Sequence, residues 1–169
     1  GLVMVGGPNS FENGGYANSS VAAMLPVTFG DSTQGSARIV MAIDVSGSAS
    51  EGMRVQKSIA LDALSQLGDD NTVGVVGFNY EAYSVSEPVQ LREGRERIED
   101  RIRRLEAGGA TDIAMGLRGA EEMMDGERGT VILVSDGADR ASPSRAVADS
   151  MGRQGIRVIA VGAGQNVNE

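Results

Sequence analysis

The sequence predicts an α/β fold built on a doubly wound, mostly parallel sheet. Short apolar runs that are continuous rather than alternating recur along the chain, as expected of strands buried on both faces. Segments with apolar residues at helical spacing separate these runs. Glycine is frequent, at 24 of 169 residues, and gathers at the ends of the segments, which is typical of tight connections between strands and helices.

The first half of the sheet follows from these runs. The first strand is predicted over residues 37–44, and a helix with leucine and alanine on one face follows over about 51–67. Residues 72–78 (TVGVVGF) form the second buried strand. A third strand over 82–89 comes after only three residues (NYE), so it must run antiparallel to the second and lie at an edge of the sheet, where Pro88 is tolerated.

The second half continues the alternation. Helices are predicted over residues 93–105, about 112–124 and 143–155, with buried strands over 130–134 and 156–161. With right-handed crossovers we expect the strand order 3-2-1-4-5. The first and fourth strands are then neighbours at the point where the order reverses, and open α/β sheets bind ligands at that point, beyond the carboxyl ends of the strands.

Composition excludes several classes of function. The net charge is −8 and no basic stripe is present, so a nucleic-acid partner is not expected. The chain has no histidine and no cysteine, which excludes Ser-His and Cys-His nucleophiles and a structural zinc site. No apolar run approaches the length of a membrane span, so we expect no direct insertion into a membrane by this segment.

Oxygen-bearing side chains gather where two of the strands end. Asp44, Ser46 and Ser48 follow the first strand at alternate positions, and Asp136 follows the fourth strand. Thr111 lies in the loop that opens the third helix. Because the carboxyl ends of neighbouring parallel strands meet at one edge of a sheet, we expect these side chains to converge. Carboxylate and hydroxyl oxygens are ligands of hard cations, so the sequence predicts a divalent-cation site.

The same residues could instead cap helices and turns. The three side chains after the first strand could cap the helix that follows, and Asp136 could cap the next turn. One such group alone would favour capping, whereas five coincident positions at the switch point favour the metal. Asp112 is interpreted as a helix cap or a residue that supports the ligands. Asp139 and Arg140, on a loop near the site, either tune the choice of partner or are simply solvated.

Together and in this order, Asp44-x-Ser46-x-Ser48, Thr111 in GGATDI and Asp136 in VILVSDG resemble the von Willebrand factor A domain with its metal-ion-dependent adhesion site (MIDAS). The resemblance implies a Rossmann-like fold and a divalent cation, usually Mg²⁺, with Mn²⁺ or Ca²⁺ possible. Ser46 and Ser48 would bind the metal directly, and Thr111 directly or through water. Asp44 and Asp136 would act mostly through water or as hydrogen-bond acceptors.

The resemblance implies a binding module, not an enzyme. Neutral hydroxyl ligands leave the cation under-neutralised, and Mg²⁺ prefers an octahedral shell of oxygens. One position is then left for an Asp or Glu carboxylate of a protein partner. The expected function is therefore metal-dependent adhesion or scaffolding.

Two alternatives remain. One is a Mg²⁺-dependent phosphoryl-transfer enzyme with Asp44 as the nucleophile. Enzymes of that kind usually need a second acid two residues on and a nearby lysine, whereas this chain has Ser46 there and a single lysine, Lys57. The other is a degenerate structural domain whose metal affinity is too weak to matter, against which the intact motif argues.

Two domains are expected. Residues 1–36 are predicted to be an appendage and linker, and residues 37–169 the von Willebrand A domain. Residues 1 to about 28 resemble a segment of the glutamine-amidotransferase-like domain that lies beside a von Willebrand A domain in some large bacterial membrane proteins. This implies a soluble region of a membrane-anchored bacterial protein, without amidotransferase chemistry. Relatives usually add a helix, a strand and a helix after the fifth strand, so the domain is expected to be incomplete at its C-terminus.

Overall fold

The computed structural model describes residues 36–47, 52–137 and 143–162. Contacts divide the chain into two units, Gly1–Gly35 and Ser36–Glu169, and every described residue belongs to the second unit. The appendage predicted at the N-terminus therefore lies almost entirely outside the described residues, as does one of the predicted metal ligands, Ser48.

The described part of the chain alternates strands and helices as predicted. In chain order the elements are β1 (Arg38–Asp44), α1 (Met53–Gln66), β2 (Thr72–Phe78), β3 (Ala82–Gln90), α2 (Leu91–Arg103), α3 (Ile113–Met124), β4 (Gly129–Ser135), α4 (Ser144–Arg153) and β5 (Ile156–Gly162). Helix α4 begins one residue later than predicted, with Pro143 as its N-cap.

The predicted gap between the third strand and the second helix is wrong. Strand β3 runs to Gln90 and α2 begins at the next residue, two residues before the predicted start. The reason is tertiary, because the backbone N–H of Leu91 donates to the carbonyl of Asn71 (2.9 Å) and that of Arg92 to the carbonyl of Asp69 (3.0 Å). These bonds satisfy donors that a local cap would otherwise have to satisfy.

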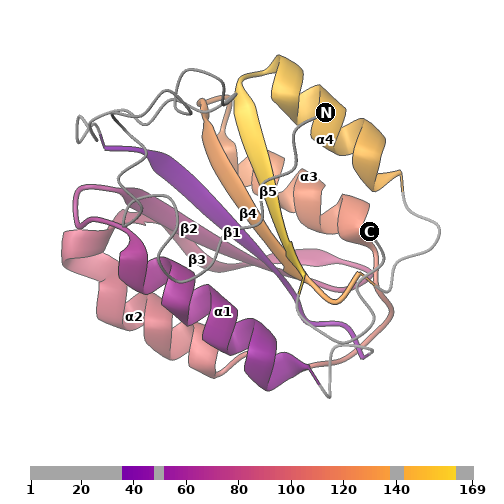
Figure 1. Ribbon diagram of the computed structural model, residues 1–169, viewed down its shortest axis with the longest axis horizontal. Helices are drawn as coiled ribbons and strands as arrows, with labels where there is room; N and C mark the ends of the chain where they lie inside the picture. Colours follow the sequence, from indigo (N-terminus) through magenta and orange to yellow (C-terminus); the bar gives the residue numbers. More distant parts are fainter. Residues whose placement is uncertain (1–35, 48–51, 138–142, 163–169) are drawn as a thin grey trace, which may run out of the picture. The chain divides into compact units, whose positions relative to one another are not determined.

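The predicted sheet topology is confirmed. The strand order is β3-β2-β1-β4-β5, with β3 antiparallel to β2 and all other pairs parallel (Figure 1). The β2–β3 pairing contains register shifts between Val73 and Val76, and Pro88 lies on the edge strand β3, as its missing N–H requires.

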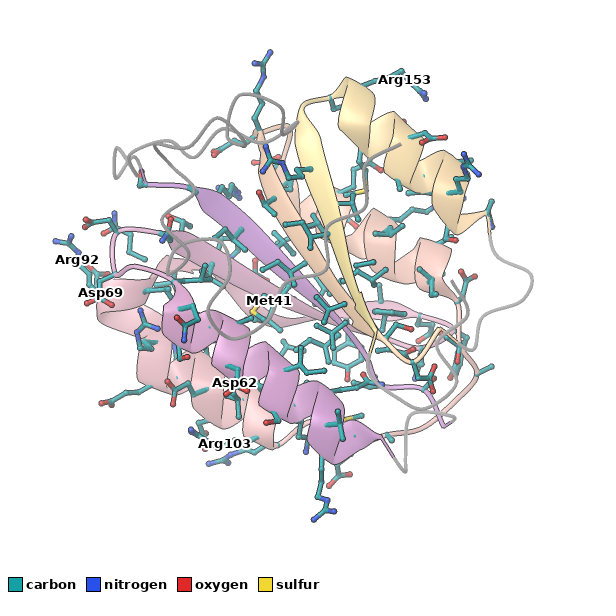
Figure 2. The ribbon with its side chains drawn as sticks, viewed as in Figure 1. Met41, Asp62, Asp69, Arg92, Arg103 and Arg153 are labelled. Atoms are coloured by element: carbon teal, nitrogen blue, oxygen red, sulfur yellow. The ribbon has the colours of Figure 1, made fainter. Side chains whose placement is uncertain are left out.

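Strand β1 divides the core into two layers. Its residues Ile39, Met41 and Ile43 pack with buried side chains of α1 and α2, and Met41 is seen in this layer in Figure 2. The alternate residues Val40 and Ala42 pack with buried side chains of α3 and α4. The two helix pairs accordingly cover opposite faces of the sheet (Figure 1). A strand buried on both faces explains why its sequence is continuously apolar.

The outer face of α2 is charged. Ion pairs join Glu99 to Arg103 and Asp100 to Arg104, each at 2.9 Å and partly exposed, with Arg103 labelled in Figure 2. Exposed pairs of this kind contribute little to stability, so they fit a solvated helix face. None of the helices in the described ranges is long and apolar enough to cross a membrane.

Candidate metal centre

Asp44 is the last residue of β1 and is fully buried at the carboxyl edge of the sheet. Its Oδ1 atom accepts a hydrogen bond from the backbone N–H of Ser46 (2.9 Å), and its Oδ2 atom accepts one from the hydroxyl of Ser135 (2.8 Å). The Ser135 hydroxyl also accepts from the backbone N–H of Gly137 (3.1 Å). The carboxylate is therefore fixed by the loop that follows β1 and by the last residue of β4.

Burial raises the pKa of the Asp44 carboxyl above its ordinary value, because removal from water disfavours the charged form. Hydrogen bonds from Ser46 and Ser135 lower this pKa in part, and the nearby charge of Asp136 raises it further. Among the described residues no arginine or lysine forms an ion pair with Asp44. A divalent cation would offset both acids, so the donor chemistry of this edge fits a metal.

The loop that carries Thr111 is held against the loop after β1. The backbone N–H of Gly47 donates to the carbonyl of Gly109, and the N–H of Gly108 donates to the carbonyl of Val45, both at 2.7 Å. Glycine at position 47 leaves room for this close approach, since a Cβ there would lie 3.0 Å from the Gly109 oxygen. Thr111 itself is half-buried and lies two residues after Gly109.

The turn between β2 and β3 is bound to the same loop through Asn79. The Asn79 carbonyl accepts from the backbone N–H of Asp112 (2.9 Å), and its side-chain Nδ2 donates to the carbonyl of Gly108 (2.9 Å). Its Oδ1 accepts from the backbone N–H of Glu81 (3.0 Å), which closes the turn. Four loops therefore meet at this edge: those after β1, β2 and β4, and the loop before α3.

The capping hypothesis can be judged for several residues. The predicted cap at Asp112 is confirmed, because its Oδ1 accepts from the backbone N–H of Met115 (3.1 Å) at the start of α3. The N-cap of α1 is Gly52, so neither Asp44 nor Ser46 occupies the capping position of that helix. Asp44 uses its oxygens within its own loop and across to β4.

The structure brings together most of the predicted metal residues. Asp44 and Ser46 are both fully buried and in contact, and Asp136 is close enough for its charge to act on Asp44. Thr111 lies on the loop paired with theirs. The remaining predicted ligand, Ser48, and the loop residues Asp139 and Arg140 lie outside the described residues.

Sequence reasoning missed Ser135 and Asn79. Ser135 immediately precedes Asp136, and the register that pairs Ile43 with Val134 places it beside Asp44. Asn79 immediately follows β2, whose last residue pairs with Asp44. Polar residues at the ends of adjacent strands were the available signal for both.

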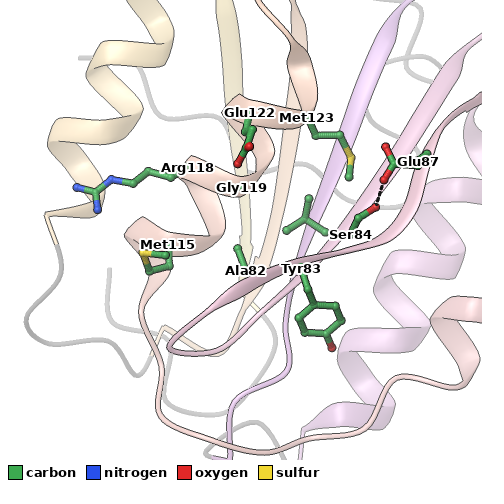
Figure 3. Close-up of a pocket in the computed structure, with 10 residues that line it drawn as sticks. Ala82, Tyr83, Ser84, Glu87, Met115, Arg118, Gly119, Glu122 and Met123 are labelled. Atoms are coloured by element: carbon green, nitrogen blue, oxygen red, sulfur yellow. Dashed lines mark hydrogen bonds between the residues drawn. The ribbon is translucent and has the colours of Figure 1, made fainter.

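A separate pocket of about 440 Å³ lies between β3 and α3, lined in part by Tyr83, Arg118 and Glu122 (Figure 3). At its rim the Ser84 hydroxyl donates to the Glu87 carboxylate (2.7 Å). None of the predicted metal residues lines this pocket.

Comparison with known proteins identifies the family. The sequence profile of the von Willebrand factor type A domain matches residues 39–138, more than half of the chain. The chain belongs to the von Willebrand factor type A domain family. Domains of this family are typically metal-dependent protein-interaction modules and are generally not enzymes. A search of curated proteins found no matching sequence.

Solved structures share the von Willebrand A fold with this chain. A von Willebrand factor type A protein from Catenulispora acidiphila is 22% identical, with a TM-score of 0.68 over 78% of this chain and 34% of that one. An aerotolerance-related membrane protein from Bacteroides fragilis is 17% identical, with a TM-score of 0.62 over 76% and 68%. Proximal thread matrix protein 1 from the mussel byssus, solved with a zinc-occupied MIDAS motif, is 24% identical, with a TM-score of 0.61 over 78% and 39%. The chain thus spans only part of each of these proteins.

Proposed function

We propose that this von Willebrand A domain binds a divalent cation through Asp44, Ser46, Ser48, Thr111 and Asp136, and that a partner protein's carboxylate completes the coordination. The observation that carries the proposal is the fully buried Asp44 carboxylate beside a second acid. A buried charge of this kind is unfavourable without compensation. A cation from solvent supplies the compensation, which accounts for keeping an acid at this position.

The donor set favours Mg²⁺, with Mn²⁺ or Ca²⁺ as substitutes. It consists of hydroxyl and carboxylate oxygens, which are ligands for hard cations, and includes no nitrogen or sulfur. When bound, the metal supplies a Lewis-acidic position that attracts an anionic oxygen. Ser135 and Asn79 position the site. Ser135 holds the Asp44 carboxylate, and Asn79 holds the neighbouring loops in place.

An adhesion or scaffolding role fits the site better than phosphoryl transfer. The single lysine of the chain, Lys57, donates from its Nζ to the carbonyl of Arg103 on α2 (2.8 Å). The ammonium group of Lys57 therefore links α1 to α2. It does not offer a cation to a phosphate at the carboxyl edge of the sheet where Asp44 and Asp136 lie, which we call the metal edge. The second position of the motif remains Ser46, not an acid.

Calorimetric titration of Mg²⁺ into chelator-treated protein tests the metal site. We expect saturable binding at one site, and a fall in affinity of about tenfold or more for Ser46→Ala, as is usual when a residue of a metal site is lost. Ser65→Ala is the matched control, since Ser65 is exposed on α1 and its hydroxyl makes only local bonds, to the carbonyl of Asp62 and from the side-chain amide of Gln66. Equal affinities for wild type and Ser46→Ala, with both folded by circular dichroism, would contradict the proposed ligand set.

We also propose that the domain belongs to a membrane-anchored bacterial protein. The support is the resemblance of residues 1 to about 28 to an amidotransferase-like segment of such proteins and the shared fold with the Bacteroides fragilis membrane protein. On this proposal residues 1–36 are a structural appendage of the interaction domain that occupies residues 37–169.

A further inference from the structure

Tyr80 is an aromatic side chain left exposed at the metal edge. It lies in the turn between β2 and β3 and is 58% exposed, more than any other large apolar side chain among the described residues. Exposure alone requires no explanation, because much of any protein surface is apolar. The position of Tyr80 is what distinguishes it.

The ring of Tyr80 lies against Gly109. A Cβ atom at Gly109 would be 2.9 Å from both Cδ1 and Cε1 of the ring. Gly109 also accepts, through its carbonyl, the hydrogen bond from Gly47 in the loop of Asp44 and Ser46. A single glycine therefore connects the aromatic ring to the loop that carries the proposed metal ligands.

The turn that carries Tyr80 is held on both sides. Its Asn79 bonds to Gly108 and to Asp112 on one side, and the N–H of Asn79 donates to the carbonyl of Glu81 (2.9 Å) across the turn. A partner that covers the ring consequently gains apolar contact with little loss of backbone freedom. Tyrosine is over-represented among the residues that dominate binding energy at interfaces, and pre-ordering lowers the entropic cost of binding.

We infer that Tyr80 is a specificity-determining residue of the metal edge, and that it selects a partner with an aromatic or aliphatic group beside its coordinating carboxylate. The inference rests on the proposed function, because the carboxylate must first be held by the metal. The acids around the edge, including Asp136 and the exposed Glu81, favour an uncharged neighbour over a second carboxylate.

Two simple carboxylates provide the probe. Acetate and 3-phenylpropionate both carry one carboxylate, but only the second carries an aromatic group that can reach a neighbouring ring. We expect NMR titration of the Mg²⁺-saturated protein to give about two- to tenfold tighter binding of 3-phenylpropionate, the range of an aromatic pair contact. Binding of both should disappear in chelator. The ring-proton signals of Tyr80 should shift with 3-phenylpropionate and not with acetate.

Variants separate recognition from a structural role. Tyr80→Ala should bind both carboxylates with the affinity of acetate and should bind Mg²⁺ as the wild type does, whereas Tyr80→Phe should keep the preference. Tyr83→Ala is the matched control, because Tyr83 is 45% exposed on the same hairpin but packs over Gly77 of β2.

The possible failures are distinguishable. Equal affinities of the two carboxylates for the wild type, or a preference that survives in Tyr80→Ala, overturn the role of Tyr80 and leave the metal-dependent function intact. If neither carboxylate binds the Mg²⁺-saturated protein, the proposed function fails, and the inference about Tyr80 fails with it.

Discussion

Asp44→Asn is expected to abolish divalent-cation binding and, at the same time, to make the metal-free domain more stable. The carboxylate is fully buried, and burial raises its pKa. An amide keeps an oxygen that can accept from the Ser46 N–H and offers an NH₂ to the Ser135 hydroxyl, without a charge to desolvate. We expect a gain of about 1 kcal/mol in the free energy of unfolding in chelator, a typical size for a single substitution.

The pH dependence of this gain has a defined sign. The folded-state pKa of Asp44 lies above the unfolded-state value, so its contribution to stability is most favourable below the unfolded pKa and is lost as pH rises through the folded pKa. The advantage of Asp44→Asn over wild type should therefore be present near neutral pH and shrink as the solution is acidified toward the ordinary pKa of aspartate.

Urea unfolding in chelator and Mg²⁺ calorimetry on the same samples measure the two effects. Asp62→Asn, which removes an exposed acid from α1, is the control for the change in net charge (Figure 2). An Asp44→Asn protein that is less stable than wild type in chelator would mean that the charge-assisted hydrogen bonds outweigh burial. That result would remove the main physical argument for a cation at this edge.

Gly109→Ala is expected to destabilise the domain and weaken the metal site together. Gly109 has φ +86°, where residues with a Cβ are strained, and its Cβ would lie 2.9 Å from Asn79 Nδ2 and from the Tyr80 ring. The Asn79 and Tyr80 side chains can shift to relieve the clash, but the strain at φ +86° remains, and relaxing it displaces the carbonyl that accepts from Gly47 in the loop of the proposed ligands. We expect a loss of about 2 kcal/mol in the free energy of unfolding, from strain and steric conflict combined.

The neighbouring glycine supplies a control. A Cβ at Gly108 would meet nothing within 4 Å, so Gly108→Ala should change stability by no more than about 0.5 kcal/mol. Chemical denaturation of both variants, followed by Mg²⁺ titration, makes the comparison. Similar stability and similar Mg²⁺ affinity for the two variants would contradict the role of Gly109 as the link between the loops.

Most of the fold could be predicted because the local sequence pattern indicates the type, burial and direction of each strand and helix. The continuous apolar run of β1 reflects burial on both faces, and the short link before β3 leaves no room for a parallel crossover. The start of α2 could not be predicted, because its first N–H groups are satisfied by Asn71 and Asp69 from another loop and not by a cap in its own sequence. Helix boundaries set by tertiary contacts leave no local signal.

The candidate site was partly predictable, because some of its residues lie close together in the sequence. Asp44 and Ser46 stand in a recognisable spacing and are found together at the edge of the sheet. Ser135 acts on Asp44 from 91 residues away, and Asn79 acts on backbone carbonyl and N–H groups that any residue could supply. Supporting contacts of this kind depend on strand register and loop packing, which the motif alone does not specify.

The most direct test of the central claim uses Mn²⁺ in place of Mg²⁺ and follows water-proton relaxation as acetate is added. Binding of Mn²⁺ to the domain should raise the relaxation enhancement, because the ion is slowed while it keeps several waters. Acetate should then lower the enhancement saturably as a carboxylate replaces bound water. A domain that binds Mn²⁺ but whose relaxation does not respond to acetate, or that does not bind Mn²⁺ at all, would contradict a metal site completed by a partner's carboxylate.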